Sequence, residues 1–220
     1  MQLPGLITVR SDTPEAFEHA VEIIGTSFME EQWFATWLSA LEKLGEGTER
    51  KQEILRAVIR DDLVAHVPYE GVYVLDDGAA ATGAYLYSEL SGTTHARLEA
   101  QSHANFDAIA TPAEREVLEA QARLMEPVSD FDWSRGLEHE ADHIYFFAWA
   151  VDPASRGTGA LRRLIEPFFA FADAHKLNCY LECYTDRLQS MYEHLGFSTI
   201  DELSCDGVDL IERRMVRPHA

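Results

Sequence analysis

With 220 residues, the chain is long enough for one well-buried core and too short for two large domains. Its 46% of hydrophobic residues exclude an intrinsically disordered chain, and its net charge of −20 argues against nucleic-acid or membrane partners. The first residues show no secretion signal, no apolar run is long enough for a membrane span, and three cysteines without framework spacing indicate a reducing compartment; we therefore expect a cytoplasmic protein.

The chain opens with signals for a strand and two helices. A short strand is predicted over residues 6–10, and Thr13 as N-cap with Pro14 in the first turn begins a helix. A second helix is predicted from the aromatic residues that recur with helical period over residues 33–41.

A third helix and a hairpin follow. Helical periodicity extends over residues 48–66, where Pro68 ends the helix because proline cannot continue it. Two apolar, β-rich runs over residues 71–90 lie on either side of Asp77-Gly78, a dipeptide that favours the tight turn of a β-hairpin.

The segment 91–143 is less regular and strongly acidic. One clear helix begins at Thr111-Pro112 and runs through Leu124. Twelve acidic residues against four basic ones lie between Glu89 and Asp142, a net charge of −8. A field of this sign attracts cations and repels anions.

The last third of the chain alternates strands with helices. Residues 143–151 form a run that is apolar on both faces, which predicts a central strand, and a helix follows from Gly157 to about His175. Further elements are expected over 178–184 (strand), 186–196 (helix), 197–203 and 207–216 (closing strands). The order β-α-α-β-β-(insert)-β-α-β-α-β-β predicts a single α/β domain over residues 1–220, with a mixed central sheet flanked by helices.

One short pattern in the insert is typical of zinc proteases. His139-Glu140-Ala141-Asp142-His143 spells H-E-x-x-H, which places two histidines on one face only when a helix runs through the motif. The β-branched and aromatic run that begins at Ile144 favours a strand instead. Cys179 and Cys183 have no second pair to complete a zinc site. We therefore expect no metal at either place.

A second pattern, Arg156-Gly157-Thr158-Gly159, lies between the predicted central strand and the helix after it. Free backbone N–H groups at a helix N-terminus bind anions, and glycines allow a phosphate to approach the backbone closely. The arginines 156, 162 and 163 add positive charge. The sequence therefore predicts a phosphate-binding turn, whereas a turn with no ligand is the plainer alternative.

Two stretches around this turn resemble the GCN5-related N-acetyltransferase (GNAT) family. "VDPASRGTGALRRLI" is similar to the family's acetyl-CoA motif R/Q-x-x-G-x-G/A, in which Arg156 and Gly159 match and Leu161 stands where glycine or alanine is usual. "LECYTDRLQSMYEHLGF" is similar to the second motif, with Tyr192 before the ending Leu-Gly-Phe. The resemblance is specific over residues 145–198 and implies a GNAT-like fold.

The resemblance implies acetyl-CoA as the co-substrate and direct attack of an amine on the thioester within a ternary complex. The central strand would pair with the pantetheine arm, and one of its N–H groups would polarise the thioester carbonyl, a contact of ~3 kcal/mol. The glycine turn would bind the pyrophosphate. The cofactor-binding residues expected on this basis are Trp149, Ala150, Val151, Arg156, Gly157, Thr158, Gly159, Ala160, Leu161 and Arg162.

The resemblance also implies a general acid and a general base. Tyr192 would protonate the leaving thiolate, since a phenol with a pKa of ~10 is matched to a thiol of ~8.5. The base is left open among Glu140, Asp142 and His143 at the entry of the central strand and Glu182 in the next strand.

The acceptor is expected to be a small cationic amine, such as a polyamine or an aminoglycoside-like compound, or a lysine-rich peptide. The acidity of the segment 91–143 carries this expectation. Two alternatives stay open: a protein that binds acyl-CoA without turnover, favoured by Leu161 and Leu188, and an acidic interaction protein with a purely structural turn. A monomer or a homodimer is expected.

Overall fold

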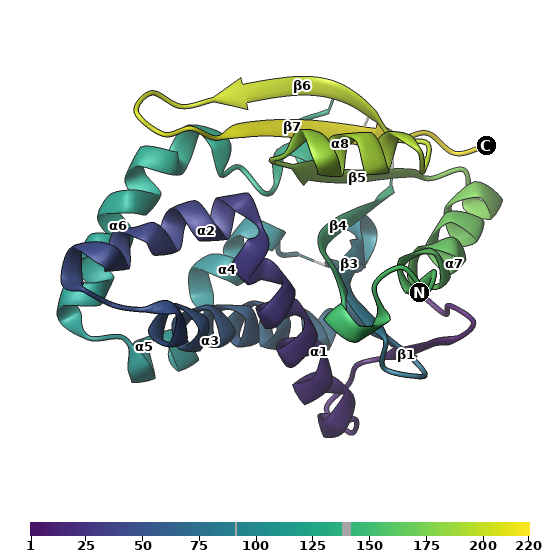
Figure 1. Ribbon diagram of the computed structural model, residues 1–220. Helices are drawn as coiled ribbons and strands as arrows, with labels where there is room; N and C mark the ends of the chain where they lie inside the picture. Colours follow the sequence, from purple (N-terminus) through teal and green to yellow (C-terminus); the bar gives the residue numbers. More distant parts are fainter. Residues whose placement is uncertain (91, 138–141) are drawn as a thin grey trace.

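The computed structural model describes residues 1–90, 92–137 and 142–220. The described residues form a twisted seven-stranded sheet with the order β1-β2-β3-β4-β5-β7-β6 (Figure 1). The strands are β1 (Leu6–Thr8), β2 (Val72–Leu75), β3 (Ala80–Leu86), β4 (His143–Val151), β5 (Asn178–Cys183), β6 (Ser198–Ser204) and β7 (Ile211–Arg217). β4 and β5 are parallel, and the other neighbours are antiparallel. The prediction of a mixed sheet with a central strand over 143–151 is confirmed.

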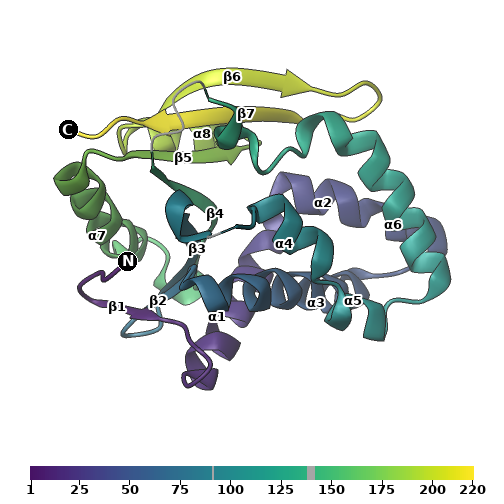
Figure 2. The same cartoon turned by 180° about the vertical axis from the view of Figure 1, so that it is seen from behind.

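Eight α-helices in the described part of the chain surround the sheet (Figures 1 and 2). Three precede the hairpin: α1 (Pro14–Ser27), α2 (Gln32–Leu38) and α3 (Thr48–His66). Three lie in the insert: α4 (His95–Gln101), α5 (Ala104–Ile109) and α6 (Pro112–Met125). Two follow the central strand: α7 (Ala160–His175) and α8 (Asp186–Glu193). No helix among the described residues is both long and apolar enough to cross a bilayer.

Two parts of the predicted order need correction. The predicted order of elements places two helices before the hairpin, but three helices precede it, in agreement with the three helical segments predicted from periodicity. The insert contains three helices where one is predicted, because α4 and α5 have only 7 and 6 residues and so show no clear period. The predicted insert helix is confirmed as α6, where Thr111 and Glu114 form a capping box.

The N-cap prediction for the first helix is wrong in its detail. α1 begins at Pro14 as expected, but the Thr13 side chain makes no bond to the helix. Its Oγ1 instead accepts from the Arg10 N–H at 2.7 Å and donates to the Arg10 carbonyl at 3.0 Å. The hydroxyl therefore stabilises the turn between β1 and α1.

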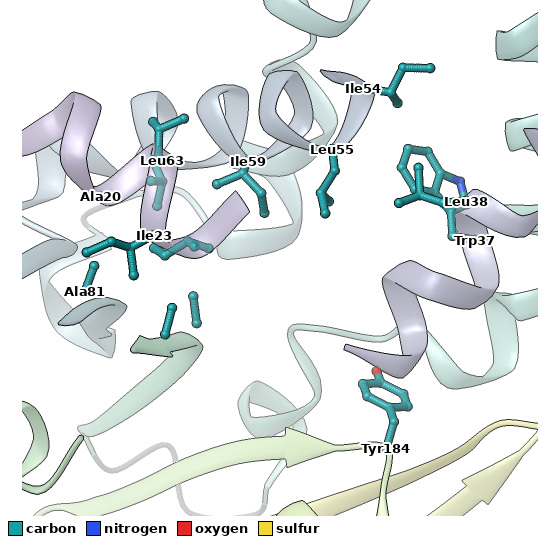
Figure 3. Packing of buried hydrophobic residues seen from close by; sticks show 14 of the residues in the cluster. Ala20, Ile23, Trp37, Leu38, Ile54, Leu55, Ile59, Leu63, Ala81 and Tyr184 are labelled. Carbon is teal, nitrogen blue, oxygen red and sulfur yellow. The ribbon is translucent and has the colours of Figure 1, made fainter. Parts of the chain in front are cut away.

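The core has two main layers, one on each face of the sheet. On one face, α1 covers β2, β3 and the second half of β4, and α3 packs on α1. Ile59 and Leu63 of α3 project toward Ile23 of α1, while Leu55 lies on the side of Leu38 (Figure 3). α7 covers the other face through a separate cluster. Burial of each such aliphatic side chain contributes ~1.5–3 kcal/mol to the stability of the fold. The two layers hold the sheet between them.

A β-bulge interrupts the central strand at Phe147. Phe146 pairs with Ala84 and Ala148 pairs with Gly83, so that Phe147 is the extra residue. Gly83 is required here, because a Cβ at this position would lie 2.1 Å from the Phe147 ring. The bulge also exchanges the faces of β4, so that Phe146 packs in the α7 cluster and Ala148 in the α1 cluster.

β4 separates from its parallel neighbour soon after it begins. The ladder between β4 and β5 covers three residues and ends at Tyr145 and Tyr180. Figure 1 shows the two strands diverging beyond this point. The middle of the sheet therefore has an opening between two strands that α7 and α1 flank from opposite faces.

Candidate functional site

A cavity of about 1090 Å³ occupies the opening between β4 and β5. Its walls include β4 from Phe146 to Val151, the residues 181–185 at the end of β5, the turn before α7 and the inner side of α8. The first turn of α2 and parts of α3 and α4 complete it. Because the two strands diverge, elements on both faces of the sheet contribute to one cavity.

The predicted phosphate-binding turn forms part of this wall. Gly157 and Gly159 have φ angles of +80° and +85°, the left-handed region that glycine adopts without strain. A Cβ built at either position would meet nothing within 4 Å. Gly159 is the N-cap of α7, whose first N–H groups have no partner within the helix. Open space and free donors together make this turn suited to an anion.

Two of the three arginines of this region line the cavity, namely Arg156 and Arg162. Arg156 Nη1 lies 3.0 Å from Glu30 Oε2, a pair that bridges the turn to the segment after α1. Arg163 instead binds Asp77 in the hairpin turn at 2.7 Å, and it is not part of the cavity wall. Arg187 of α8, which the sequence analysis did not consider, also lines the cavity.

The second half of β4 presents polar groups without a protein partner. Beyond Tyr145 its edge toward β5 has no strand paired to it among the described residues. Trp149 Nε1 is buried there and has no hydrogen-bond partner in the described part of the chain. Buried donors of this kind are uncommon in proteins, so this wall is suited to a ligand that supplies acceptors.

Tyr192 of α8 lies beside this strand. Its ring meets the Trp149 ring edge-on at a centroid distance of 5.1 Å, and the residue is 8% exposed. Burial raises the pKa of the phenol above its usual value. The hydroxyl is therefore protonated at neutral pH in a residue that lines the cavity.

Glu182 of β5, one of the predicted candidates for the general base, also lines the cavity. Its Oε2 accepts from Trp133 Nε1 at 3.2 Å and from the Tyr145 hydroxyl. Burial raises the pKa of this carboxyl to about 7, although both hydrogen bonds favour the charged form. A carboxyl that titrates near neutral pH is suited to accept and release protons.

The other base candidates do not line the cavity within the described residues. Glu140 and His139 lie outside these residues. Asp142 accepts from the backbone N–H and the hydroxyl of Ser88, at 2.9 and 2.7 Å. His143 begins β4, and its Nε2 lies 3.0 Å from Ser134 Oγ. The structure therefore separates Asp142 and His143 from Glu182.

Among the ionisable residues of the cavity wall that sequence reasoning missed are Glu31, Asp62, His95 and Glu99. Burial raises the pKa of Glu31 to about 7, and its Oε1 is buried without a hydrogen-bond partner among the described residues. Glu31 caps α2 by accepting from the Phe34 N–H, but glutamate is not among the residues preferred at an N-cap, so the sequence carries no signal for this role. Asp62, His95 and Glu99 give no local signal, because only the fold brings α3 and α4 to the cavity.

One cysteine, Cys183, lines the cavity beside Glu182. Its Sγ donates to Met215 Sδ at 3.7 Å. Burial raises the pKa of this thiol to about 12.

Part of the chain is similar in sequence to known acetyltransferases. Residues 127–197 match the model of the "Acetyltransferase (GNAT) family". An uncharacterized N-acetyltransferase of Schizosaccharomyces pombe, C550.08, is 37% identical over 62 residues, which are 28% of this chain and 25% of that protein. The match therefore spans about a quarter of the length of this relative.

The fold similarity extends over the whole chain. A Corynebacterium glutamicum structure described as "histone acetyltransferase HPA2 and related acetyltransferase" matches with a TM-score of 0.59 and 17% identity, over 100% of this chain and 98% of that one. A chain of the NatC complex bound to a Gag peptide and CoA matches with a TM-score of 0.51 and 12% identity, over 100% of both chains. Residues 127–197 are therefore similar in sequence to the GNAT acetyltransferase family, and the full chain has the fold of these solved acetyltransferases.

Proposed function

We propose that the protein transfers an acetyl group from acetyl-CoA to a primary amine, and that the acceptor is a small cationic amine. The observation that carries the proposal is one cavity whose wall contains both the glycine turn before α7 and carboxylates of α3, α4 and β5. The match of residues 127–197 to the GNAT family model supports acetyl transfer, and the CoA in the NatC complex supports the co-substrate.

The residues of the cavity fit acetyl-CoA in three respects. The glycine turn leaves open space where a phosphate would approach, Arg156 and Arg162 supply positive charge, and Trp149 Nε1 is a buried donor without a partner among the described residues. Acetyl-CoA, when bound, supplies the acetyl group as a thioester. The unpaired edge of β4 would orient it, and a backbone N–H within residues 149–151 would polarise the carbonyl.

Proton transfer would use two residues, one from β5 and one from α8. Glu182 takes the proton of the ammonium group, directly or through water, so that the neutral amine forms the new C–N bond. Tyr192 donates its proton to the sulfur as the C–S bond breaks; burial keeps the phenol protonated at neutral pH, and its raised pKa also makes it a weaker acid than a free tyrosine. Holding both reactants in one cavity supplies much of the rate.

The acceptor class follows from the distribution of charge along the cavity. Arg156, Arg162 and Arg187 come from the turn, α7 and α8, whereas Asp62 and Glu99 come from α3 and α4. Figures 1 and 2 show α3 and α4 on the side of β4 away from α7. Glu99 and Asp62 raise the pKa of His95, which lines the same end, to about 9 against the effect of burial, so two carboxylates and one imidazolium leave a net negative charge there. A cationic amine would be concentrated at this end.

A panel of amines tests the function. CoA thiol release should be fastest with small cationic acceptors and slowest with acidic amino acids. For the best acceptor, kcat/KM should fall as ionic strength rises, because salt screens exposed charges beyond about 8–10 Å.

The outcomes of this assay separate the alternatives. Acetyl-CoA binding without thiol release for any amine would indicate a protein that only binds acyl-CoA, to which Leu161 and Leu188 in the wall would contribute. No binding at all would leave the turn structural. A best acceptor that is anionic would contradict the proposed charge selection.

The glycine turn can be tested by Gly159→Trp. The indole should fill the space of the pyrophosphate, so calorimetry with acetyl-CoA should show no binding. Gly207→Trp is the matched control, since Gly207 has a φ of +82°, equal open space around its Cβ and a position in the β6–β7 loop. Binding that survives in the Gly159 variant, or that is lost equally in both, would place the cofactor elsewhere.

The role of Tyr192 can be tested by Tyr192→Phe, which keeps the ring and its contact with Trp149. Turnover should fall by about 10²-fold or more, the usual scale for a general acid, while acetyl-CoA affinity stays nearly unchanged. Tyr73→Phe is the control, because the Tyr73 hydroxyl is also buried but lies outside the cavity wall. Equal turnover in the wild type and the Tyr192 variant would assign this ring to packing alone.

The raised pKa of Glu182 predicts a pH dependence. Below pH 7 the carboxyl is protonated and cannot accept a proton, so kcat/KM should rise with pH through a midpoint near about 7. In Glu182→Gln the rate should fall by about 10²- to 10⁴-fold and this midpoint should vanish. Glu31→Gln is the control, since Glu31 also has a pKa of about 7. Loss of the midpoint in the Glu31 variant instead would reassign the base.

A further inference from the structure

Two buried histidines face one another at the α3–α4 side of the cavity. His66 comes from the last turn of α3 and His95 from the first turn of α4, and they are 0% and 1% exposed. His66 Nε2 lies 2.8 Å from His95 Nδ1. Neither belongs to the two metal-like patterns of the sequence, and 29 residues separate them.

The outer nitrogen of each ring has its own acceptor. His66 Nδ1 lies 2.8 Å from the Asp62 carbonyl oxygen, which can only accept, so this nitrogen carries the hydrogen and Nε2 presents a lone pair. His95 Nε2 lies 3.3 Å from Glu99 Oε1, so it likewise donates outward. A carbonyl or a carboxylate on the outer nitrogen is the usual arrangement of histidines that bind a metal through the other nitrogen.

A carboxylate completes the group. Asp62 Oδ1 is buried and lies 3.4 Å from His66 Nδ1, but it accepts no hydrogen bond of normal geometry among the described residues. Ligand atoms of Asp62, His66 and His95 all lie within 4.8 Å of one another. A buried carboxylate oxygen without a partner is costly, and a cation between these three side chains would satisfy it.

Aromatic neighbours hold the two rings in place. The Phe147 ring lies 4.4 Å from the His66 ring and 5.0 Å from the His95 ring, and Tyr85 stacks on His66 at 6.1 Å. Rings packed in this way present their nitrogens in a fixed direction, which favours binding of a metal.

We propose that Asp62, His66 and His95 form a binding site for a divalent transition-metal ion of the Zn²⁺ class. His66 Nε2, His95 Nδ1 and the Asp62 carboxylate are the ligands, with Glu99 and the Asp62 carbonyl orienting the two rings. The ion replaces the proton shared by the facing nitrogens and releases it to solvent. A tetrahedral Zn²⁺ needs these nitrogens about 3.3 Å apart, so α3 and α4 separate slightly. Asp62 and His95 line the cavity, so the remaining coordination position faces it.

This site departs from the expectation of a metal-free protein, which rested on the sequence patterns alone. A bound ion lies where the acceptor amine would enter, a consequence that rests on the proposed function. Zn²⁺ then excludes the amine and acts as an inhibitor, and acetyl transfer itself needs no metal.

Calorimetry on the EDTA-treated full chain tests the site without any reactant. ZnCl₂ should bind at one ion per chain, and MgCl₂ should not, because Mg²⁺ prefers oxygen ligands. Co²⁺ in place of Zn²⁺ should give the visible absorption bands of a four-coordinate site. Absence of stoichiometric Zn²⁺ binding would overturn the proposal.

Variants locate the ion. Glu99→Gln removes only an orienting group and should weaken Zn²⁺ binding about 10- to 100-fold, and His95→Asn should weaken it more. Glu99 is 35% exposed, so this variant tests the site even where His95→Asn does not fold. His103→Asn is the control, an exposed histidine of the same insert. Unchanged affinity in the Glu99 variant, or loss of binding only in His143→Asn, would overturn the assignment.

The inhibition is measured separately. Zn²⁺ should raise KM for the best amine and leave KM for acetyl-CoA unchanged. An amine KM that does not respond to Zn²⁺ would overturn the placement of the ion at the acceptor entrance. If no amine is acetylated, calorimetry still decides the metal site, so that failure of the proposed function and failure of this inference are distinguishable.

Discussion

The early end of the β4–β5 ladder is the constraint on which the rest of the structure depends. Two parallel strands that stayed paired would close the centre of the sheet and keep its two faces apart. Here pairing ends at Tyr145 and Tyr180, and the strands diverge. The bulge at Phe147, which only a glycine at position 83 accommodates, lies just past this point. The cavity exists because β1 to β4 stay paired on one side of this opening and β5, β7 and β6 on the other, while β4 and β5 are unpaired beyond Tyr145.

The opening also determines how charge is arranged. Arginines reach the cavity from the elements that follow β4, and most of the carboxylates reach it from helical segments that precede β3 or belong to the insert, with Glu182 of β5 as the exception. An isolated exposed ion pair such as Arg156–Glu30 contributes ~0–1 kcal/mol to stability. The separation of the two signs therefore does little for the fold, but it gives the cavity one end suited to anions and another suited to cations.

The sequence predicts the C-terminal part of the fold closely, because its signals are local. Gly157 and Gly159 mark a turn, and Thr185 caps α8 by accepting from the Leu188 N–H at 3.2 Å. α7 begins at Ala160 and not at Gly157, since both glycines adopt positive φ. For the carboxylates of the cavity wall, the sequence predicts only the net negative charge of the insert and not which residues reach the cavity. Asp62 and His66 lie in α3, far from the insert in sequence. Helical periodicity predicts which face of a helix is buried, but not that this face borders a cavity.

The neighbourhood of Cys183 bears on the order of chemical events. Only a thiolate is an effective nucleophile, and with a pKa of about 12 this thiol is ionised in a fraction on the order of 10⁻⁵ at pH 7. A thioester in the cavity would thus lie beside a sulfur that cannot compete for its acyl group. The burial that raises this pKa therefore disfavours a covalent acyl intermediate on Cys183, and direct attack by the amine needs no such intermediate.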